Sequence, residues 1–497
     1  MRQLERALRS RVAILPELSV RGGLTCRAVA LGCLLLIANA YWIMAGLMWR
    51  QHRPTTVSLF VNVVFTLWIL VLLNRAIAHV APKRALRPQE LVIIYAILTL
   101  GSAMCSLDFM QPFIAVIAYP IWFATPSNRW DVLLLPHIPT SLVVTDKTAL
   151  KDYVTGHSSF YYVDTMKAWM TPLVVWGIFM LLLVFGMLAL VILLQREWTE
   201  RARLSYPIVQ TPYELIRRDG VLGRKSLWVG FIIAASMNLI NGLHELYPSF
   251  PAIGGVRFDI SPYFTQRPWN AIGWTPLVLL PFGIGLGFLI PLDLALSCWL
   301  FYLFWKLERI VTAATGWGDI PNFPYIEEQQ FGAYMGLAVA SLWVSRSYIA
   351  TAARAAFAVK HHDNASEANS HIRIAGYSLW AFIACFIGLL IFCLRFGMRL
   401  WVASLFFASY YLLSIGITRL RAELGSPVHD LHRGGPNLVM VNAIGTNFLS
   451  PRDLSMLSLF HFFNRAYRGH AMPHQLESFK LGQLLHARFR DVGIALA

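Results

Sequence analysis

Charged residues are scarce in this sequence. Asp, Glu, Lys and Arg together make up 14% of its 497 residues, whereas an ordinary soluble domain contains about 25%. Hydrophobic residues reach 57%, and they occur in long separate blocks that one soluble core would not need. The low charge and the block pattern therefore predict an all-α polytopic integral membrane protein.

Several motifs that carry chemistry are missing. The sequence has no GxxxxGK[ST] phosphate loop, so it does not predict an ATP-driven pump. GxSxG, HExxH and the dinucleotide-binding fingerprint are missing as well. The six cysteines include no CxxC pair, which argues against a zinc site and a disulfide framework. We therefore expect no enzyme, and we predict no catalytic residue, no metal and no cofactor.

Acidic residues are also few. There are 42 Lys and Arg residues against 26 Asp and Glu residues, which gives a net charge of +16. A surplus of this size is compatible with nucleic-acid binding. However, the basic residues lie beside the apolar blocks, as the positive-inside rule describes for membrane proteins. We therefore expect the lipid bilayer, and not nucleic acid, to be the main partner.

The apolar blocks predict about 10–12 membrane segments, some of them re-entrant or broken, since a complete span needs roughly 20 residues. Eight blocks are long: 26–49, 57–78, 91–110, 169–194, 227–245, 331–349, 374–394 and 400–418. Four are shorter: 112–125, 275–290, 291–305 and 438–463.

Basic connections orient these segments. We expect a basic cytoplasmic segment at 1–25, one transmembrane domain over 26–463 and a basic cytoplasmic segment at 464–497. Residues 126–167 and 246–274 should then form outer loops. The chain is thus expected in the inner membrane, with both termini in the cytoplasm.

Residues 275–305 form an apolar segment that cannot be one regular helix. The residues expected to break it are Pro281, Gly283, Gly285, Gly287 and Pro291. Broken helices at membrane depth need protein or a water-filled cavity around their free carbonyls, and many transporters build binding sites from them. Asp293 follows the break, where its carboxylate either binds a substrate amine, a cation or the coupling proton, or favours the start of the next helix.

Other polar residues extend the predicted pathway. Asn238, Asn241 and Glu245 recur at helical spacing, so they share one face, either lining a site or bonding to neighbouring helices. Asp108 lies near the outer end of block 91–110, as a pathway residue or as an interfacial cap.

Three charged residues follow block 400–418. Arg419, Arg421 and Glu423 are candidates for a cytoplasmic gate made of ion pairs. Ordinary anchoring of a span by basic residues is the alternative for the two arginines.

Three segments together resemble the oligopeptide transporter superfamily and its uncharacterised bacterial relatives. They are REWTERARLSYPIVQTPYEL at 196–215, FGIGLGFLIPLDLALSCWLF at 282–301 and RLRAELGSP at 419–427. MPHQLESFKL at 472–481 is similar to the same bacterial relatives.

This resemblance implies a secondary active transporter that uses protons to move small peptides, amino-acid derivatives or metal chelates across the inner membrane. Two alternatives stay open. One is an integral-membrane enzyme that acts on a lipid-linked substrate at the outer loops. The other is a non-transporting subunit of a larger membrane complex; a homo-oligomer is a further possible assembly.

Overall fold

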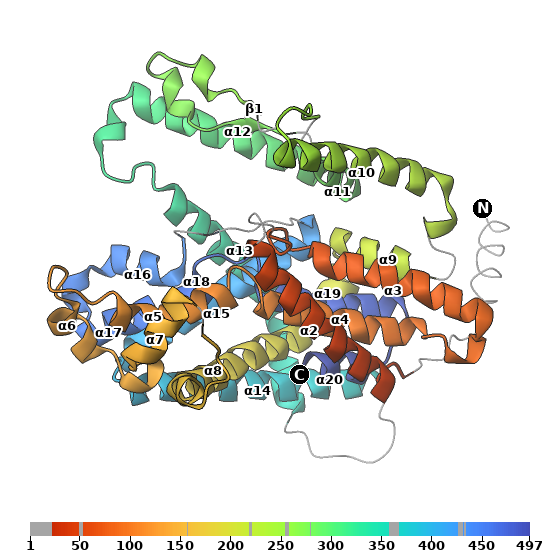
Figure 1. The fold of residues 1–497 in the computed structure, drawn as a ribbon, viewed down its shortest axis with the longest axis horizontal. Helices are drawn as coiled ribbons and strands as arrows, with labels where there is room; N and C mark the ends of the chain where they lie inside the picture. The colour runs from red at the N-terminus through yellow and green to blue at the C-terminus, as the bar shows by residue number, and fades with distance from the viewer. Residues whose placement is uncertain are drawn as a thin grey trace.

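The computed structural model describes residues 22–48, 53–156, 158–217, 221–253, 258–278, 280–356, 367–425, 431 and 434–497. Nearly all of them are helical or in short turns, and the strands among them form one antiparallel pair, β1 (Phe258–Asp259) with β2 (Pro276–Leu277). Six of the described helices are long and apolar enough to cross a membrane: α2 (Cys26–Met48), α3 (Val61–Val80), α8 (Val163–Arg196), α10 (Lys225–Leu246), α14 (Glu367–Arg395) and α15 (Leu400–Leu424). The predicted all-α class, with several membrane-type helices, is confirmed (Figure 1).

The other elements are shorter or more polar. The α-helices are α4 (Pro88–Met104), α5 (Met110–Trp122), α6 (Trp130–Leu133), α7 (Lys147–Thr155), α9 (Gln210–Ile216), α11 (Pro281–Leu289), α12 (Leu292–Ala314), α13 (Ile326–Ala355), α16 (Pro436–Ile444), α17 (Pro451–Leu459), α18 (His461–Asn464), α19 (Ala471–Leu484) and α20 (Phe489–Leu496). The short turns are η1 (Pro82–Arg84), η2 (Leu135–His137), η3 (Thr140–Leu142), the π-helical η4 (Glu197–Arg201), η5 (Pro207–Val209), η6 (Val221–Gly223), η7 (Ser261–Tyr263), η8 (Trp269–Ile272), η9 (Trp317–Asp319) and η10 (Thr446–Phe448).

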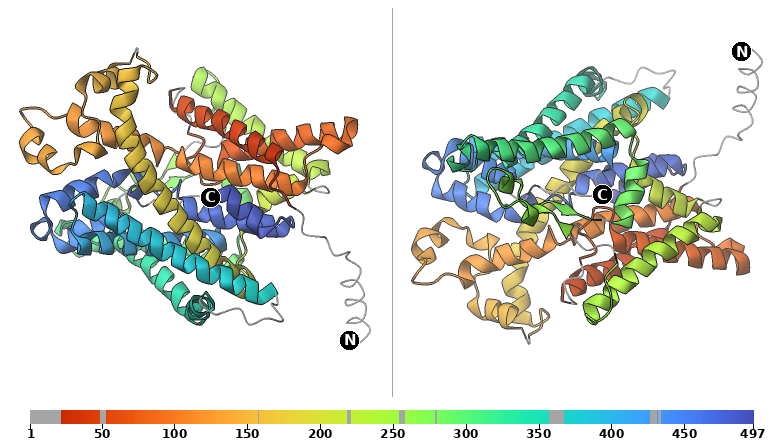
Figure 2. Two further views of the ribbon diagram at one scale, coloured as in Figure 1. Left: turned by 90° about the horizontal axis from the view of Figure 1, so that it is seen from below. Right: turned by 90° about the horizontal axis from the view of Figure 1, so that it is seen from above.

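Close helix packing builds the main bundle. A Cβ atom at Gly101 of α4 would clash with Leu36 of α2, so the glycine lets these two helices approach each other. On the face of the bundle shown from below in Figure 2, α8 and α14 run side by side. There the rings of Phe179 and Phe392 lie 5.1 Å apart between their centroids. Both large aromatic side chains and glycines at close approaches thus build the core of the bundle.

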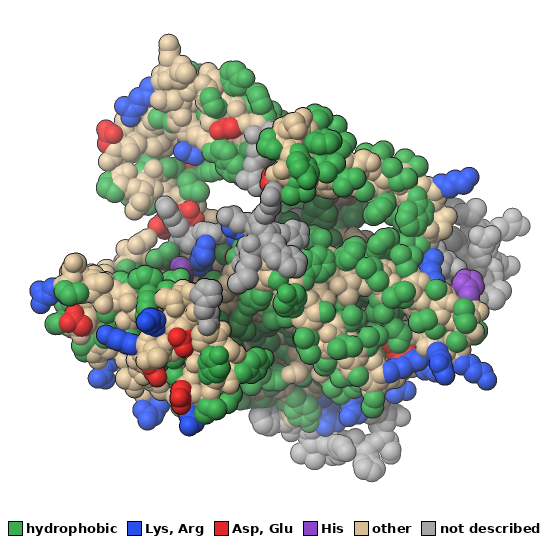
Figure 3. Space-filling view, in the orientation of Figure 1, with side chains coloured by type: hydrophobic (Ala, Val, Ile, Leu, Met, Phe, Trp, Pro, Cys, Tyr) green, Lys and Arg blue, Asp and Glu red, His purple; other side chains and the backbone are tan. Residues whose placement is uncertain are grey.

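The described residues between 225 and 314 form an arm that lies along one side of the bundle (Figure 1). The arm contains α10, the strand pair, α11 and α12, and apolar side chains cover much of its surface (Figure 3). It meets the bundle through apolar contacts: Trp68 of α3 stacks on Phe231 of α10 at 5.9 Å, and Leu286 of α11 packs with Leu59 and Ile208. The expected outer loop 246–274 lies in this arm.

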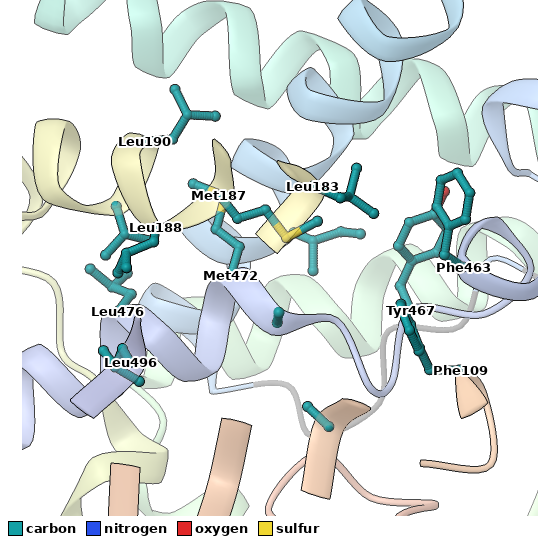
Figure 4. Packing of buried hydrophobic residues seen from close by; sticks show 14 of the residues in the cluster. Phe109, Leu183, Met187, Leu188, Leu190, Phe463, Tyr467, Met472, Leu476 and Leu496 are labelled. Carbon is teal, nitrogen blue, oxygen red and sulfur yellow. The ribbon is translucent and has the colours of Figure 1, made fainter. Parts of the chain in front are cut away.

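The longest helix, α8, packs against α19 near the C-terminus of the chain. Figure 4 shows Met187 of α8 beside Met472 of α19, with Leu188 and Leu476 further along the same contact. In α19, all residues except Lys480, Gln483 and Leu484 are buried. Residues 464–497 thus include one of the most buried helices of the bundle, while the domain boundary at residue 463 stays a prediction. The polar residues of α19 conceal this helix from a hydropathy pattern, since their partners come from distant parts of the chain.

Two contacts bear on the predicted sidedness. Gly23 N donates to Asp491 Oδ2 at 2.8 Å, so the two ends of the described chain lie together, while residues 1–21 lie outside the described residues. With residues 1–25 inside, block 26–49 as a complete span would place the start of block 57–78 outside, and the predicted cytoplasmic gate places the end of block 400–418 inside. However, Arg421 Nη2 donates to the Ser58 carbonyl at 3.1 Å, and a hydrocarbon core about 30 Å thick cannot separate groups in contact. The predicted sides of these two block ends therefore conflict, and the orientation of the chain stays a prediction.

Candidate functional site

Segment 275–305 begins with strand β2 (Pro276–Leu277), and its helical part is broken at one point. Helix α11 ends at Leu289, and α12 begins at Leu292 after Pro291. The glycines Gly283, Gly285 and Gly287 lie inside α11, so they do not break it. Pro281 begins α11, at a position where its missing N–H is no loss.

Asp293 lies in the first turn of α12 and is exposed. The position places its carboxylate near the positive end of the helix. Its own carbonyl accepts a hydrogen bond from Ser297 Oγ at 2.9 Å. The arm thus presents Asp293 at its surface, whereas its buried charged residue is Lys306 of α12, whose Nζ donates to the Trp274 carbonyl at 2.8 Å.

The predicted polar face of α10 mainly organises the arm. Asn241 Nδ2 donates to the Ile253 carbonyl at 3.0 Å, and Asn241 Oδ1 accepts from Ile253 N at 2.8 Å. Asn238 Nδ2 donates to the carbonyl of Ala234, one turn earlier. Asn238, Asn241 and Glu245 are on the arm, whereas Asp108 is in the bundle (Figure 1). The structure therefore does not gather these residues and Asp293 into one pathway.

Asp108 is buried and forms a two-point ion pair with Arg468. Arg468 Nε donates to Oδ2 at 2.7 Å, and Nη2 donates to Oδ1 at 3.1 Å. Ser58 Oγ donates to the Arg468 carbonyl at 2.7 Å. Asp108 thus ties the segment before α19 to the segment after α4, and Ser58 ties it to the segment before α3.

The predicted gate separates into two ion pairs. Arg419 Nε and Glu423 Oε2 are 3.3 Å apart, and both residues are half-buried on α15. Arg421 instead faces the core with 2% of its surface exposed, and it contacts Glu477 of α19. Its Nε and Nη2 atoms each donate to a different carboxylate oxygen at 2.6 Å. Arg419, Arg421 and Glu423 therefore do not form one gate.

We define the buried polar centre as Tyr95 and Thr99 of α4, Arg421 of α15, and His474 and Glu477 of α19. All five residues are buried. Thr99 Oγ1 and His474 Nδ1 are hydrogen bonded at 3.1 Å, and Arg421 Nη2 lies 3.5 Å from the same nitrogen. His474 and Glu477 are three residues apart on one helix, so both side chains point to the same side. Three helices thus converge on one ion pair.

The surroundings fix this centre. The Phe60 ring stacks on His474 with centroids 4.5 Å apart, and the Ser58 carbonyl accepts from Arg421. Among the described residues, Arg421 Nη1 has no hydrogen-bond partner. A buried guanidinium normally satisfies all its donors, so this nitrogen retains the ability to bind another acceptor. The centre therefore combines a fixed charge pair with one unused donor.

A second buried histidine precedes α19. Burial lowers the pKa of His470 to about 3, so the ring is neutral in the folded protein at pH 7, whereas an exposed histidine has a pKa of about 6.5. The unfolded chain then binds more protons than the folded one between these values, and stability falls as the pH decreases through this range. We expect acidification from pH 7 to 5 to destabilise the wild type by about 2 kcal/mol more than His470→Gln. Thermal unfolding in detergent at both pH values measures the difference, and equal losses would contradict a neutral buried His470.

The sequence segments that carry the family resemblance meet around this centre. Tyr206 N, in segment 196–215, donates to the Ala422 carbonyl of segment 419–427 at 2.9 Å. Arg421 in turn binds Glu477 of segment 472–481. Segment 282–301 touches the same end of the bundle through Leu286. His474 and Glu477 were not predicted as site residues, and the signal that pointed to them was this similarity of MPHQLESFKL.

No curated protein and no solved structure matches the chain. One family of unknown function, DUF6785, matches residues 19–497. Because this match covers nearly all of the sequence, the chain belongs to DUF6785.

Proposed function

We propose that this chain is a secondary active transporter and that the buried polar centre couples transport to protons. The observation that carries the proposal is the Arg421–Glu477 pair. It is buried in the bundle, and Arg421 lies within α15, one of the helices long enough to span a membrane. Ionisable residues inside membrane domains are costly and usually serve a function.

The charges of the pair suggest how coupling works. Removing one partner of a buried ion pair leaves an isolated charge, at a cost of about 3–5 kcal/mol. A proton on Glu477 and a substrate carboxylate on Arg421 would replace both charges together, so the centre would stay neutral. The unused donor Arg421 Nη1 gives the guanidinium a further contact for that carboxylate, since Arg binds carboxylates in a two-point geometry. One proton would then accompany each carboxylate.

We also propose where the chain lies and which substrates it carries. We place the chain in the inner membrane, with both termini cytoplasmic and about 10–12 segments including broken ones. The resemblance to oligopeptide transporters supports small peptides, amino-acid derivatives or metal chelates as substrates. A peptide with a free C-terminus carries a carboxylate, which suits Arg421. Asp293 remains a candidate for a site that forms when the arm moves.

Proteoliposomes under an imposed pH gradient test the proposal. The probes are the di-, tri- and tetrapeptides of alanine. We expect gradient-driven uptake by the wild type and at least a tenfold loss with Glu477→Gln, because glutamine keeps the shape but cannot exchange a proton.

Asp453→Asn is the matched control. Asp453 is also a buried carboxylate, paired with Arg399 at 2.6 Å, but it lies outside the buried polar centre. Uptake should persist in this variant. Equal uptake by wild type and Glu477→Gln, or no gradient-driven uptake of any of the peptides, would contradict the proposal.

A cavity in loop 126–167 favours the alternative of an outer-face enzyme. It measures about 370 Å³ and is lined by Asp152, Tyr153, Phe160 and Trp169, among others. Aromatic walls with one carboxylate suit a sugar or an amine. If the chain acted there on a lipid-linked substrate, Asp152→Asn would abolish turnover of that substrate. The wild type would then show no peptide uptake.

A further inference from the structure

An apolar groove separates the arm from the bundle. The groove measures about 430 Å³ and lies between α3, α9, α10 and α11. Among the described residues that line it, Thr211 is the one polar side chain. Trp68, Trp228, Phe231 and Phe282 provide large aromatic walls.

Protein atoms leave this groove partly open. Phe231 is 49% exposed and Phe282 is 43% exposed, although Phe231 also stacks on Trp68. Water gains few hydrogen bonds in such surroundings. The groove therefore calls for an apolar occupant, and burial of each methylene group would contribute about 0.8 kcal/mol.

Basic residues lie at one end of the groove. Arg224 and Lys225 are exposed and stand in sequence between the lining residues Leu222 and Leu227. Lys and Arg side chains are visible in Figure 3 near the end of the arm where α10 begins. Arg217 follows α9, where its guanidinium lies 3.9 Å from Glu214, so it is partly neutralised. Arg224 and Lys225 thus add a net positive charge beside an apolar wall.

We propose that this groove binds one acyl chain of an anionic phospholipid, with the phosphate held by Arg224 and Lys225. Basic sites beside membrane helices attract anionic headgroups by about 1 kcal/mol per Lys or Arg. Trp228 lines the groove and follows Arg224 and Lys225 closely in sequence. Its indole N–H donates to the Leu222 carbonyl at 2.9 Å, as suits a tryptophan at a membrane interface. The lipid would fill the gap and hold the arm against the bundle. This proposal does not depend on the transport activity.

Native mass spectrometry of the delipidated full-length chain tests the binding. The protein is incubated with dioleoyl phosphatidylglycerol or dioleoyl phosphatidylcholine in the same detergent. We expect one tightly bound phosphatidylglycerol and a preference of about tenfold or more over phosphatidylcholine.

Two sets of variants separate the headgroup from the acyl chain. Arg224→Gln/Lys225→Gln should abolish the preference, whereas Lys83→Gln/Arg84→Gln, which removes the same charges from the exposed turn η1, should keep it. Thr211→Trp should fill the groove and weaken both lipids, with gel filtration confirming that each variant is folded.

Some outcomes would overturn the proposal. One is equal retention of the two lipids by the wild type. Another is an equal loss of preference in both charge variants. A lipid-free dimer whose formation is blocked by Thr211→Trp would show that a second copy of the chain occupies the groove instead.

Discussion

Arg421→Ala is expected to destabilise the folded protein by about 3–5 kcal/mol. The substitution leaves the Glu477 carboxylate buried without its two hydrogen bonds of 2.6 Å. It also removes the donor to the Ser58 carbonyl, which links the start of α3 to α15. Unfolding in mixed micelles with increasing denaturing detergent measures this loss against the wild type.

A double variant separates the charge from the packing. Arg421→Met/Glu477→Leu replaces both charged side chains with apolar ones of similar length, and such replacements are often neutral or stabilising. We expect the double variant to recover most of the stability that Arg421→Ala loses. Neither variant should transport, because both lack the guanidinium. If Arg421→Ala unfolded like the wild type, the ion pair would not be buried as described.

Gly416→Leu is expected to have the second-largest effect, about 3 kcal/mol or more of lost stability. A Cβ atom at Gly416 of α15 would lie 2.5 Å from the Tyr334 carbonyl oxygen of α13. Backbone cannot yield as a flexible side chain does, so a larger residue must separate the two helices. Because α15 also carries Arg421, the same displacement should disturb the buried polar centre.

Gly336→Leu is the matched control. Gly336 lies on α13 as well, but a Cβ atom there would meet nothing within 4 Å. The stability of the Gly336→Leu variant should stay close to that of the wild type in the same unfolding assay. A similar loss from both variants would show that the effect comes from the leucine itself and not from the α13–α15 contact.

The apolar helices could be predicted because their signal is local. The blocks 26–49 and 400–418 correspond to α2 (Cys26–Met48) and α15 (Leu400–Leu424), since a run of apolar residues suffices to mark them. The break before Asp293 was likewise local, because proline alone ends α11. The position of the arm beside the bundle was not, because it depends on contacts between distant parts of the chain, such as Trp68 with Phe231.

The buried polar centre could not be predicted, because its parts are far apart in sequence. Arg421 looked like a membrane anchor after an apolar block, and α19 looked like a basic cytoplasmic segment. Arg421 and α19 can both be buried because Glu477 of α19 supplies the charge opposite to that of Arg421, 56 residues away in sequence. Asp108 shows the same effect with Arg468. A hydropathy pattern treats every polar residue as unfavourable for burial, and it cannot detect an ion-pair partner that is distant in sequence.

Exchange of alanyl peptide across the membrane, measured beside gradient-driven uptake, tests the central claim most directly. Glu477→Gln mimics the protonated carboxyl group, so the centre could still bind a peptide carboxylate at Arg421 and carry it across. We predict that this variant exchanges external labelled dialanine for internal unlabelled dialanine, yet accumulates none under a pH gradient. Accumulation equal to that of the wild type would contradict a coupling role for the Arg421–Glu477 pair.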